Sequence, residues 1–332
     1  MMYFLQWTGW DSLRVAPFAM LALAVMVMVM VMVMVMVLAW LMAQRPVAAV
    51  AEPSVRWFGG EGVPAPEIAR TIWSYWHDDV VPPVVARCMA NWQRLNPGYT
   101  VHMVSGSTLG QHLPDVPTGL HRLAAPKQSD WIRLALLARH GGIWLDASIF
   151  LTRSLDWVQQ VHHAHGGHFV GYHLDRYADV SPFPVVDSWF LAAAAGSPFI
   201  RDWLALFQRE IVEGDTDEYL QSLQRAGTHA AYAQRIGSPN YHTVHVCAQQ
   251  LLQEHPQRYA LVLLRAEDGP YALHVPSRWK RKRLYVRLLW HRAPSPAPAL
   301  IKLRGGERRK LAPYLHWGLY RRHSLVGQHL MP

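Results

Sequence analysis

The strongest constraint on this chain is a stretch of 29 residues, positions 15–43, that contains no charged side chain. Arg14 precedes it and Arg45 lies two residues beyond it, and about 20 apolar residues suffice for a helix to cross a bilayer. Residues 25–37 alternate strictly between Val and Met. Because both types are apolar, the alternation gives no amphipathic strand signal, and a lone strand in lipid would leave its backbone groups unsatisfied. We therefore expect a transmembrane helix over residues 15–43, preceded by a tail over residues 1–14.

Two other origins of this stretch stay open. The tripeptide Ala49-Val50-Ala51 mimics a signal-peptidase site, although the apolar run exceeds the roughly 7–15 residues usual in a signal peptide. The Val-Met alternation could also be an expanded repeat in the DNA, with translation starting later, for example at Met42. The flanking charges, Arg14 on one side and Arg45 with Arg56 on the other, do not decide the orientation in a membrane.

The composition excludes several classes of protein. Charged residues make up 17% of the 332 residues, against about 25% in ordinary soluble domains. This excludes a disordered tail protein, a coiled coil and a disulfide-stapled secreted scaffold. Cys88 and Cys247 are far apart in the sequence, so we expect two buried free thiols in a reducing compartment. The sequence contains no Asn-x-Ser/Thr site, which disfavours the lumen of the secretory pathway.

The middle of the chain has the periodicity of a folded domain. Residues 44–67 are rich in Pro, Ala, Val and Gly without a helical period, which predicts a linker. Further on, short apolar runs predict strands, and segments of period 3.6 bounded by Ser, Pro or Gly predict helices. Strands are expected at residues 99–104, 143–146, 168–172 and 259–264, and helices at residues 129–140, from Ser197-Pro198 onward and at 244–254. This alternation predicts an α/β sandwich with a mostly parallel sheet, in a domain over residues 68–275.

The sequence beyond Pro276 has the composition of a basic tail. It contains fourteen Lys and Arg against one acid, Glu307, so the formal +9 of the chain is concentrated in residues 276–332. Basic, aromatic and apolar residues mix at Trp279, Lys280, Arg281, Lys282, Arg283, Tyr285, Leu288, Leu289 and Trp290. This mixture favours adhesion to an anionic membrane surface, with nucleic-acid binding or a merely solvated helix as alternatives. We expect the excess positive charge to lie beside a membrane rather than around a ligand site.

Residues 129–148 combine polar side chains in a pattern that indicates chemistry: Ser129-Asp130, Arg133, Gly141-Gly142, Trp144, Asp146 and Ser148. Asp130 and Arg133 fall in the first turn of the expected helix, where they share one face and where an anion is favoured. Arg binds phosphate oxygens, and Asp accepts hydrogen bonds from sugar hydroxyls. A short strand then delivers Asp146 at its carboxyl end, where open α/β sheets bind ligands and a carboxylate can hold a divalent cation. The structural alternative is a helix, a glycine cap and a strand that ends in Asp.

This motif resembles glycosyltransferases of the capsular polysaccharide synthesis type, which are related to fungal mannosyltransferases with a DxD sugar-binding region and, more distantly, to clostridial glucosylating toxins. The family pattern is S-D-x-x-R, a helix, and then G-G-x-Y/W-x-D-x-D/S/T. Weaker matches flank the motif: Ile72-Trp73-Ser74-Tyr75-Trp76, Pro82-Pro83, Cys88, Asn91-Trp92 and Asn96-Pro97-Gly98-Tyr99 before it, and Asp187-Ser188-Trp189-Phe190 and Gly196-Ser197-Pro198-Phe199 after it. The resemblance covers residues 68–275.

The resemblance implies a GT-A-like fold that binds a nucleotide sugar and transfers the sugar with retention. It assigns Trp76 to stacking on the nucleotide base. It assigns Asp130 and Arg133, as catalytic residues, to the donor sugar and its phosphates, and Asp146 to the first carboxylate of the DxD motif. Asp187 is a further donor-binding candidate and the one nucleophile that the sequence offers.

Metal dependence stays open at this stage. Ser148 stands where the second DxD carboxylate would be, yet the family pattern tolerates Ser or Thr there, and a hydroxyl can ligate a hard cation. Asp146, Ser148 and His245 are the candidate ligands for Mn²⁺ or Mg²⁺. For His245, and for His242 beside it, a diphosphate contact or a packing role are the alternatives.

We therefore predict a single-pass membrane glycosyltransferase with a cytoplasmic catalytic domain. Its partners would be a nucleotide-sugar donor and a polysaccharide or lipid-linked acceptor, so that it builds a capsular or related polysaccharide or a glycolipid. Nucleic acid is not expected as a partner. A non-catalytic sugar-nucleotide-binding or assembly protein and a glycosyltransferase that modifies proteins are the alternatives.

Overall fold

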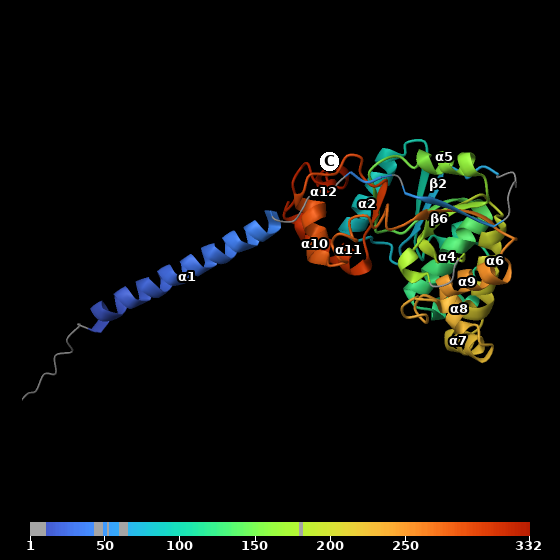
Figure 1. Ribbon diagram of the computed structural model, residues 1–332, viewed down its shortest axis with the longest axis horizontal. Helices are drawn as coiled ribbons and strands as arrows, with labels where there is room; N and C mark the ends of the chain where they lie inside the picture. Colours follow the sequence, from blue (N-terminus) through green and yellow to red (C-terminus); the bar gives the residue numbers. More distant parts are fainter. Residues whose placement is uncertain (1–10, 43–48, 52, 60–65, 179–181) are drawn as a thin grey trace, which may run out of the picture. The chain divides into compact units, whose positions relative to one another are not determined.

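A computed structural model describes residues 11–42, 49–51, 53–59, 66–178 and 182–332, and the chain forms two compact units, Met1–Pro46 and Val47–Pro332 (Figure 1). The first unit contains helix α1 (Asp11–Met42). Its stretch Ala19–Leu38 has a mean hydropathy of 3.1 and is, within the described ranges, the one helix long and apolar enough to cross a membrane. Because α1 begins at Asp11, the expected tail is shortened to residues 1–10, which lie outside the described residues.

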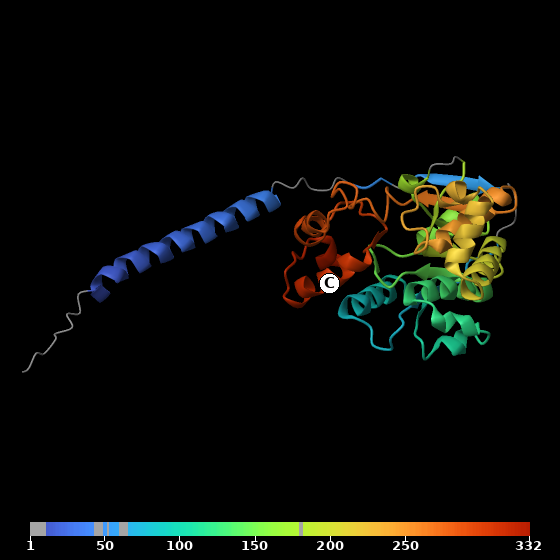
Figure 2. The same ribbon diagram turned by 90° about the horizontal axis from the view of Figure 1, so that it is seen from below.

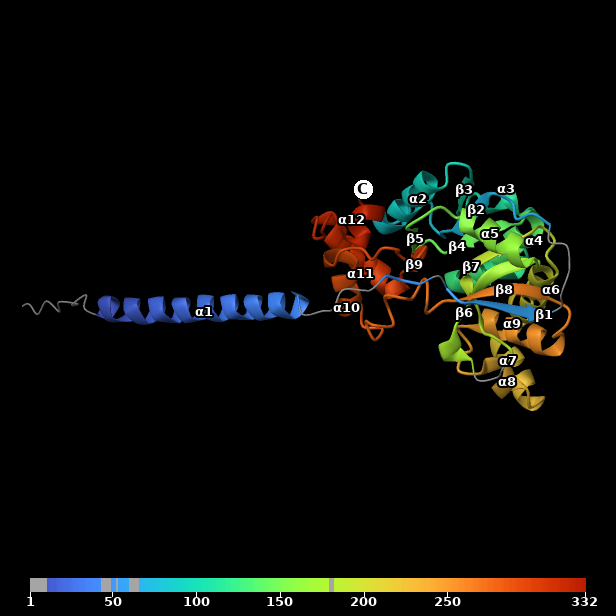
Figure 3. The same ribbon diagram turned by 45° about the horizontal axis from the view of Figure 1, so that its top comes forward.

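Seven described strands of the second unit form one sheet. In spatial order they are β1 (Val55–Gly59), β8 (Ala260–Arg265), β6 (Phe169–His173), β7 (Val186–Ala193), β4 (Gly142–Leu145), β2 (Thr71–Tyr75) and β3 (Thr100–Val104) (Figure 3). β2 is parallel to β3 and β4, and β6 is parallel to β8. β7 is antiparallel to both of its neighbours, and β1 is antiparallel to β8. The α/β class with a mostly parallel sheet is confirmed, and the reversed strands are β7, in the middle of the sheet, and β1, at its edge.

Helices cover both faces of the sheet. Side chains alternate along a strand, so Ile143 and Leu145 of β4 join one apolar cluster while Trp144 joins the other. The cluster around Trp144 is completed by α4 (Ala125–His140), α6 (Pro198–Phe207) and α9 (Thr243–Glu254). The opposite cluster is completed by α2 (Pro83–Leu95), α5 (Asp156–His165) and the C-terminal segment. Burial on both faces explains why β4 is a continuous apolar run.

Most expected elements are present within a few residues of their predicted bounds. The predicted strands correspond to β3, β4, β6 and β8, and the predicted helices to α4, α6 and α9. The further described elements are α3 (Leu109–His112), α7 (Thr216–Arg225), α8 (His229–Ala233), the 3₁₀ turns Thr118–Arg122 and Asp175–Tyr177, and the π turns Gln208–Val212 and Val286–Trp290.

The segment over residues 44–67 is only partly a linker. Strand β1 lies within it and pairs with β8 from Val55–Leu264 to Gly59–Ala260. Phe58 is 6% exposed and packs in the core. The sequence did not predict this strand, because five residues between Pro- and Gly-rich flanks are too few to show a clear period.

The basic segment over residues 276–332 is not a tail but part of the folded domain. β9 (Leu300–Lys302) pairs antiparallel with β5 (Ile149–Leu151) in a second, two-stranded sheet. The same segment forms the helices α10 (Arg281–Tyr285), α11 (Gly305–His316) and α12 (Leu325–His329). Of these, α11 packs beside α2 (Figure 2). Leu288 and Leu289 are fully buried. These leucines therefore cannot insert into a lipid surface, and only polar residues of α10 remain exposed for such a contact.

Candidate functional site

A cleft of about 650 Å³ lies at one edge of the main sheet. β2 and β4 are parallel, so the residues that follow them, Trp76 and Asp146, reach the same edge. β7 is antiparallel to β4, so its first residues lie there too, and Asp187 also lines the cleft. The topology thus brings together three candidates from distant parts of the sequence.

Helix α4 adds Asp130 and Arg133 to the floor of this cleft. The helix begins at Ala125 with Pro126 in its first turn, so the two residues do not lie at the helix start as predicted. The partial charge of a helix N-terminus falls off within its first turn and therefore does not act on them. Asp130 is 7% exposed and Arg133 is 6% exposed.

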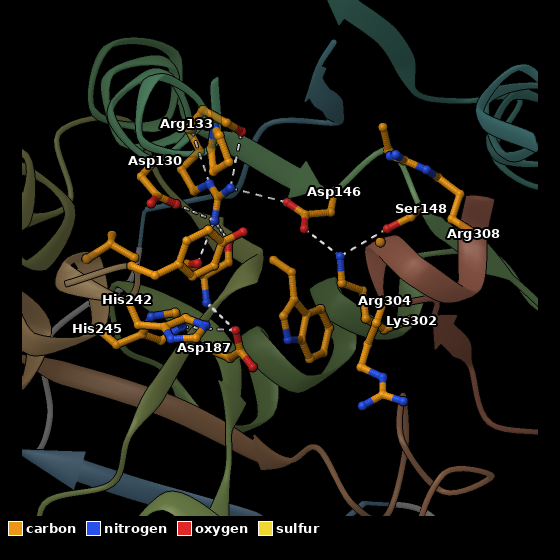
Figure 4. A pocket seen from close by; sticks show the side chains of 18 of the residues that line it. Asp130, Arg133, Asp146, Ser148, Asp187, His242, His245, Lys302, Arg304 and Arg308 are labelled. Carbon is orange, nitrogen blue, oxygen red and sulfur yellow. Dashed lines mark hydrogen bonds and ion pairs between the residues drawn. The ribbon is translucent and has the colours of Figure 1, made fainter. Parts of the chain in front are cut away.

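Arg133 holds this group of side chains together. Its guanidinium lies 3.0 Å from Asp130 Oδ1 and 3.4 Å from Asp146 Oδ1. Nη1 also donates to the carbonyl of Ser188 at 2.9 Å, and Nε donates to the carbonyl of Ser129 at 3.2 Å. The guanidinium is thus fixed from α4 and from β7, and it links both predicted acids (Figure 4).

The two acids differ in protonation behaviour. Burial raises the pKa of Asp130 to about 6, although Arg133 opposes that shift. Burial would also raise the pKa of Asp146, but the neighbouring Lys302 and Arg133 outweigh it and lower that pKa below its usual range. At neutral pH the cleft therefore contains a firmly ionised Asp146 and a more easily protonated Asp130.

Lys302 also lines the cleft, where the sequence did not predict it. Its Nζ lies 2.5 Å from Asp146 Oδ2 and donates to Ser148 Oγ at 3.1 Å (Figure 4). The side chain reaches this place because Lys302 on β9 pairs with Ile149 on β5, directly after Ser148. Trp144 Nε1 donates to the other oxygen of Asp146 at 3.1 Å.

The donor set at this point does not fit a divalent cation. An ammonium group already bridges Asp146 and Ser148, the two residues at the DxD positions. Among the described residues no group of three or more His, Cys, Asp or Glu could hold a metal ion. The third predicted ligand, His245, directs Nε2 to Asp187 Oδ1 at 3.2 Å.

Asp187 and His245 form a pair that also lines the cleft. Asp187 is 6% exposed, and the same Oδ1 accepts the backbone N–H of Ser188 at 2.8 Å. The ring of His242 lies edge-on to that of His245 at 5.4 Å. Both histidines line the cleft, so neither is a residue of the interior core alone.

Trp76 forms one end of the cleft. The guanidinium of Arg308 lies 4.4 Å from the centre of its ring. Its Nε1 is buried and has no hydrogen-bond partner among the described residues. An aromatic face with an unused N–H donor is a suitable surface for a planar, hydrogen-bonding ligand.

The wall beside Trp76 is built by the C-terminal segment. Lys302, Arg304, Gly305, Arg308 and Arg309 all line the cleft. The expectation that the basic residues lie away from the ligand site is therefore wrong for these four cations. The 12-residue helix α11 begins at Gly305, so its N-terminus also faces this space.

A buried acid orients Arg304 in that wall. Glu307 is 2% exposed, and its side chain accepts Arg304 Nε at 2.7 Å and His274 Nε2 at 3.1 Å. Burial alone would raise the pKa of Glu307, but these hydrogen bonds outweigh it and lower that pKa to about 2. Arg304 also donates to the carbonyl of Trp279 at 2.9 Å.

Comparison with known proteins finds a family that part of the chain resembles. The family described as Capsular polysaccharide synthesis protein matches residues 61–213. Residues 61–213 are thus similar to capsule-synthesis-type glycosyltransferases. O-glycosyltransferase braB of Annulohypoxylon truncatum is 31% identical over 165 residues, which cover 42% of this chain and 37% of that protein. O-glycosyltransferase PaGT of Phomopsis amygdali is 31% identical over 108 residues, which cover 28% of this chain and 27% of that protein.

The chain thus spans about a third of the length of the curated relatives that it matches. Among solved structures, mouse xyloside xylosyltransferase 1 aligns with a TM-score of 0.40 and 10% identity, over 73% of this chain and 99% of that one. The glycosyltransferase GlyE of Streptococcus pneumoniae aligns with a TM-score of 0.36 and 9% identity, over 77% of this chain and 66% of that one.

The region that this family matches contributes only part of the cleft lining. It contains Trp76, Asp130, Arg133, Asp146 and Asp187. Lys302, Arg304 and Arg308 lie almost a hundred residues beyond its end, as the sequence numbers show. The cleft therefore joins the family motif to a basic wall that lies outside the family match.

Proposed function

We propose that this protein transfers a sugar from a nucleotide-sugar donor to a hydroxyl group of a surface polysaccharide or glycolipid. One observation carries the proposal: the acidic residues of the family motif and the cations of the C-terminal segment line one cleft. A nucleotide sugar needs both, since its sugar presents hydroxyl groups and its diphosphate is an anion. Two relatives named O-glycosyltransferases support an oxygen acceptor.

The diphosphate would bind along the C-terminal wall. Lys302, Arg304 and Arg308 supply positive charge there, and charge-assisted hydrogen bonds to phosphate are among the stronger polar contacts in proteins. The N-terminus of α11 adds backbone N–H groups and a favourable partial charge. The base of the donor would then stack on Trp76.

The donor sugar would lie over Asp130 and Arg133. Ionised Asp130 accepts hydrogen bonds from sugar hydroxyls, while Arg133 bridges Asp130 and Asp146 and holds both in fixed positions. Such a site acts mainly by fixed charges aimed at the diphosphate as it leaves. Retention of configuration by double displacement would need a nucleophile on the opposite face of the sugar, for which Asp187 is the candidate.

Membrane attachment through α1 is the second part of the proposal. The exposed, apolar stretch Ala19–Leu38 supports a single crossing, with the catalytic unit in the cytoplasm, where nucleotide sugars are available. Lys280, Arg281 and Lys282 are exposed and could approach anionic lipid headgroups. Resistance of the protein to carbonate extraction, combined with protease accessibility in inverted vesicles, tests anchoring and orientation together.

The activity is tested by a donor screen followed by turnover. A true donor raises the melting temperature of the full-length protein, since binding to the folded state stabilises it by mass action. Asp146→Ala should then abolish transfer of radiolabelled sugar and leave the fold intact, whereas Asp115→Ala, an exposed acid outside the cleft, should leave transfer unchanged. Equal turnover by Asp146→Ala would refute the assignment.

Two alternatives correspond to other outcomes of the same screen. Donor binding without turnover on any acceptor would indicate a sugar-nucleotide-binding or assembly protein. Turnover on proteins but not on glycans or lipid-linked sugars would indicate a protein-modifying enzyme.

A further inference from the structure

The position of a lysine between the two DxD residues has a consequence for catalysis. In the strict motif two carboxylates face this point, and here one of them is the hydroxyl of Ser148. The replacement removes one negative charge. A positive charge lies at the same point, because Lys302 Nζ contacts both Asp146 and Ser148. We propose that Lys302 supplies the positive charge that a divalent cation would supply, so that transfer in this protein needs no metal ion. This inference rests on the proposed glycosyltransferase function.

The backbone holds this ammonium in place. Lys302 is 8% exposed, and its strand β9 is paired with β5 at Ile149. The N–H of Leu303, the next residue, donates to the carbonyl of Ser148 at 3.0 Å. Backbone hydrogen bonds therefore fix Lys302 next to Ser148. The lysine belongs to the structure of the site and is not a flexible surface side chain.

The two positive groups around Asp146 leave little attraction for a third cation. Arg133 already lies 3.4 Å from Oδ1, and Lys302 lies 2.5 Å from Oδ2. Both oxygens of the only carboxylate at the DxD positions are thus occupied by positive groups. A divalent ion placed between Asp146 and Ser148 would lie against the ammonium, and like charges at that distance repel strongly in a partly buried site.

The bonds, the electron pair and the proton of the transfer step are all accounted for without a metal ion. The bond between the anomeric carbon and the diphosphate oxygen breaks, and its electron pair goes to that oxygen. The acceptor hydroxyl forms the new bond to the anomeric carbon and releases its proton to the departing diphosphate or to solvent. Lys302 stabilises the charge that develops on the diphosphate.

The test uses the full-length protein in detergent with the donor found in the screen. Turnover is measured in EDTA and with added Mn²⁺ or Mg²⁺, and Mn²⁺ binding is measured separately by electron paramagnetic resonance. We expect equal turnover within about twofold in the two conditions, and no stoichiometric Mn²⁺ binding to the wild type.

Three variants separate a charge role from a folding role. Lys302→Met should lower turnover roughly 100-fold, as expected for loss of one group that stabilises the transition state, whereas Lys302→Arg keeps the charge and should retain metal-free turnover. The double variant Lys302→Met with Ser148→Asp restores the two-carboxylate motif and should bind one Mn²⁺ and become dependent on it. Lys310→Met, an exposed lysine of α11 that does not line the cleft, is the matched control and should behave as wild type.

The outcomes distinguish this inference from the proposed function. Wild-type turnover that requires Mn²⁺ or Mg²⁺ would overturn the metal-free mechanism and leave the glycosyltransferase assignment standing. Wild-type turnover in EDTA that survives Lys302→Met would equally overturn the role of Lys302. Absence of turnover with every donor, in both conditions, would overturn the proposed function and the inference with it.

Discussion

Asp130 and Arg133 form an ion pair of 3.0 Å on α4, and both side chains are almost completely buried. Placing two charges out of water is costly, and the mutual attraction offsets that cost only when the geometry is good and further hydrogen bonds are made. Arg133 meets this condition through its contacts to Ser188 and Ser129. A buried pair is weak evidence for stability by itself, so its place in the cleft points to a functional reason for keeping it.

The first prediction concerns removal of one partner of this pair. Arg133→Ala should destabilise the protein by about 3–5 kcal/mol, because it leaves Asp130 buried without its counter-charge, and it should also abolish transfer. The double variant Asp130→Asn with Arg133→Met should recover much of the stability but none of the activity. Urea unfolding and donor turnover measure the two effects.

The control for this prediction is a surface pair. Arg258 lies 2.7 Å from Asp202, but its side chain is 54% exposed, and such pairs contribute only about 0–1 kcal/mol. Arg258→Ala should therefore change neither quantity much. An equal loss of stability in the two variants would contradict the view that burial makes the Arg133 pair sensitive.

A second prediction follows from the pKa of Asp130, which burial raises to about 6. Asp130 is neutral below that pH and ionised above it, so turnover that needs the carboxylate should rise with pH through about 6. Asp130→Asn should remove this step from the pH profile of kcat/KM. A profile with the same step in wild type and variant would assign the titration to another group.

The same shift predicts a change of stability with the opposite sign. The folded-state pKa lies above the usual 3.8, so the folded protein binds a proton that the unfolded chain releases between these two pH values. The contribution of Asp130 to the free energy of unfolding is therefore fully present below pH 3.8 and is lost as the pH rises through 6. Comparing wild type with Asp130→Asn by urea unfolding over this range isolates the contribution.

The sequence predicted the half of the cleft that depends on local pattern. Gly141-Gly142 and the apolar run after them place Asp146 at a strand end, and the α4 period places Asp130 and Arg133 on one face. The start of α4 was predicted four residues late, because Ser129 has the side chain of an N-cap. The helix instead begins at Ala125-Pro126, where Pro suits the first turn, and Ser129 Oγ accepts Arg133 Nη2 at 3.2 Å.

The other half of the cleft depends on pairing between distant segments. Lys302 reaches Asp146 only because β9 pairs with β5, an antiparallel contact between Ile149 and Lys302. A three-residue strand gives almost no periodic signal, and composition alone cannot separate a lysine that lines a site from one on a solvated surface. The sequence does show a lysine at the end of the apolar run Leu300-Ile301. No local pattern, however, indicates that this lysine contacts Asp146.

A third prediction concerns Trp76 as the surface for the base of the donor. Trp76→Ala should raise the KM for the donor by roughly 10- to 100-fold, in line with stacking contributions of about 1–3 kcal/mol per base, and change kcat much less. Trp76→Phe should retain most of the stacking and lose the Nε1 donor. A matched control is Trp317→Ala, since this tryptophan is 72% exposed and does not line the cleft.

The contact between Arg308 and Trp76 refines that prediction. The guanidinium of Arg308 lies 4.4 Å from the centre of the Trp76 ring. Arg308→Ala should therefore weaken donor binding in two ways: it removes a phosphate contact, and it removes the group that packs against the ring and holds it in position. The phosphate part depends on salt, and the stacking part does not. The difference in donor affinity between wild type and Arg308→Ala should therefore shrink as the ionic strength rises. The difference between wild type and Trp76→Ala should change less.

A fourth prediction treats Glu307 as the residue that positions Arg304. Glu307→Gln keeps the size of the side chain but removes the charge that Arg304 and His274 contact. We expect a loss of about 1.5–3 kcal/mol in the free energy of unfolding, the usual contribution of hydrogen bonds to a charged group, because the remaining charge of Arg304 is 41% exposed to solvent. The donor KM should rise while the pH profile of kcat keeps its shape, since Glu307 touches the donor only through Arg304.

The pH dependence of this loss is the sharper test. Hydrogen bonds lower the pKa of Glu307 to about 2 from the usual 4.5, so its stabilising effect is present above pH 4.5 and disappears as the pH falls through 2. The difference in stability between wild type and Glu307→Gln should therefore be constant near neutrality and shrink in acid. Glu218→Gln, an exposed acid, should show no such difference at any pH. A difference for Glu307→Gln that persists to pH 2 would mean that shape rather than charge holds Arg304 in the cleft wall.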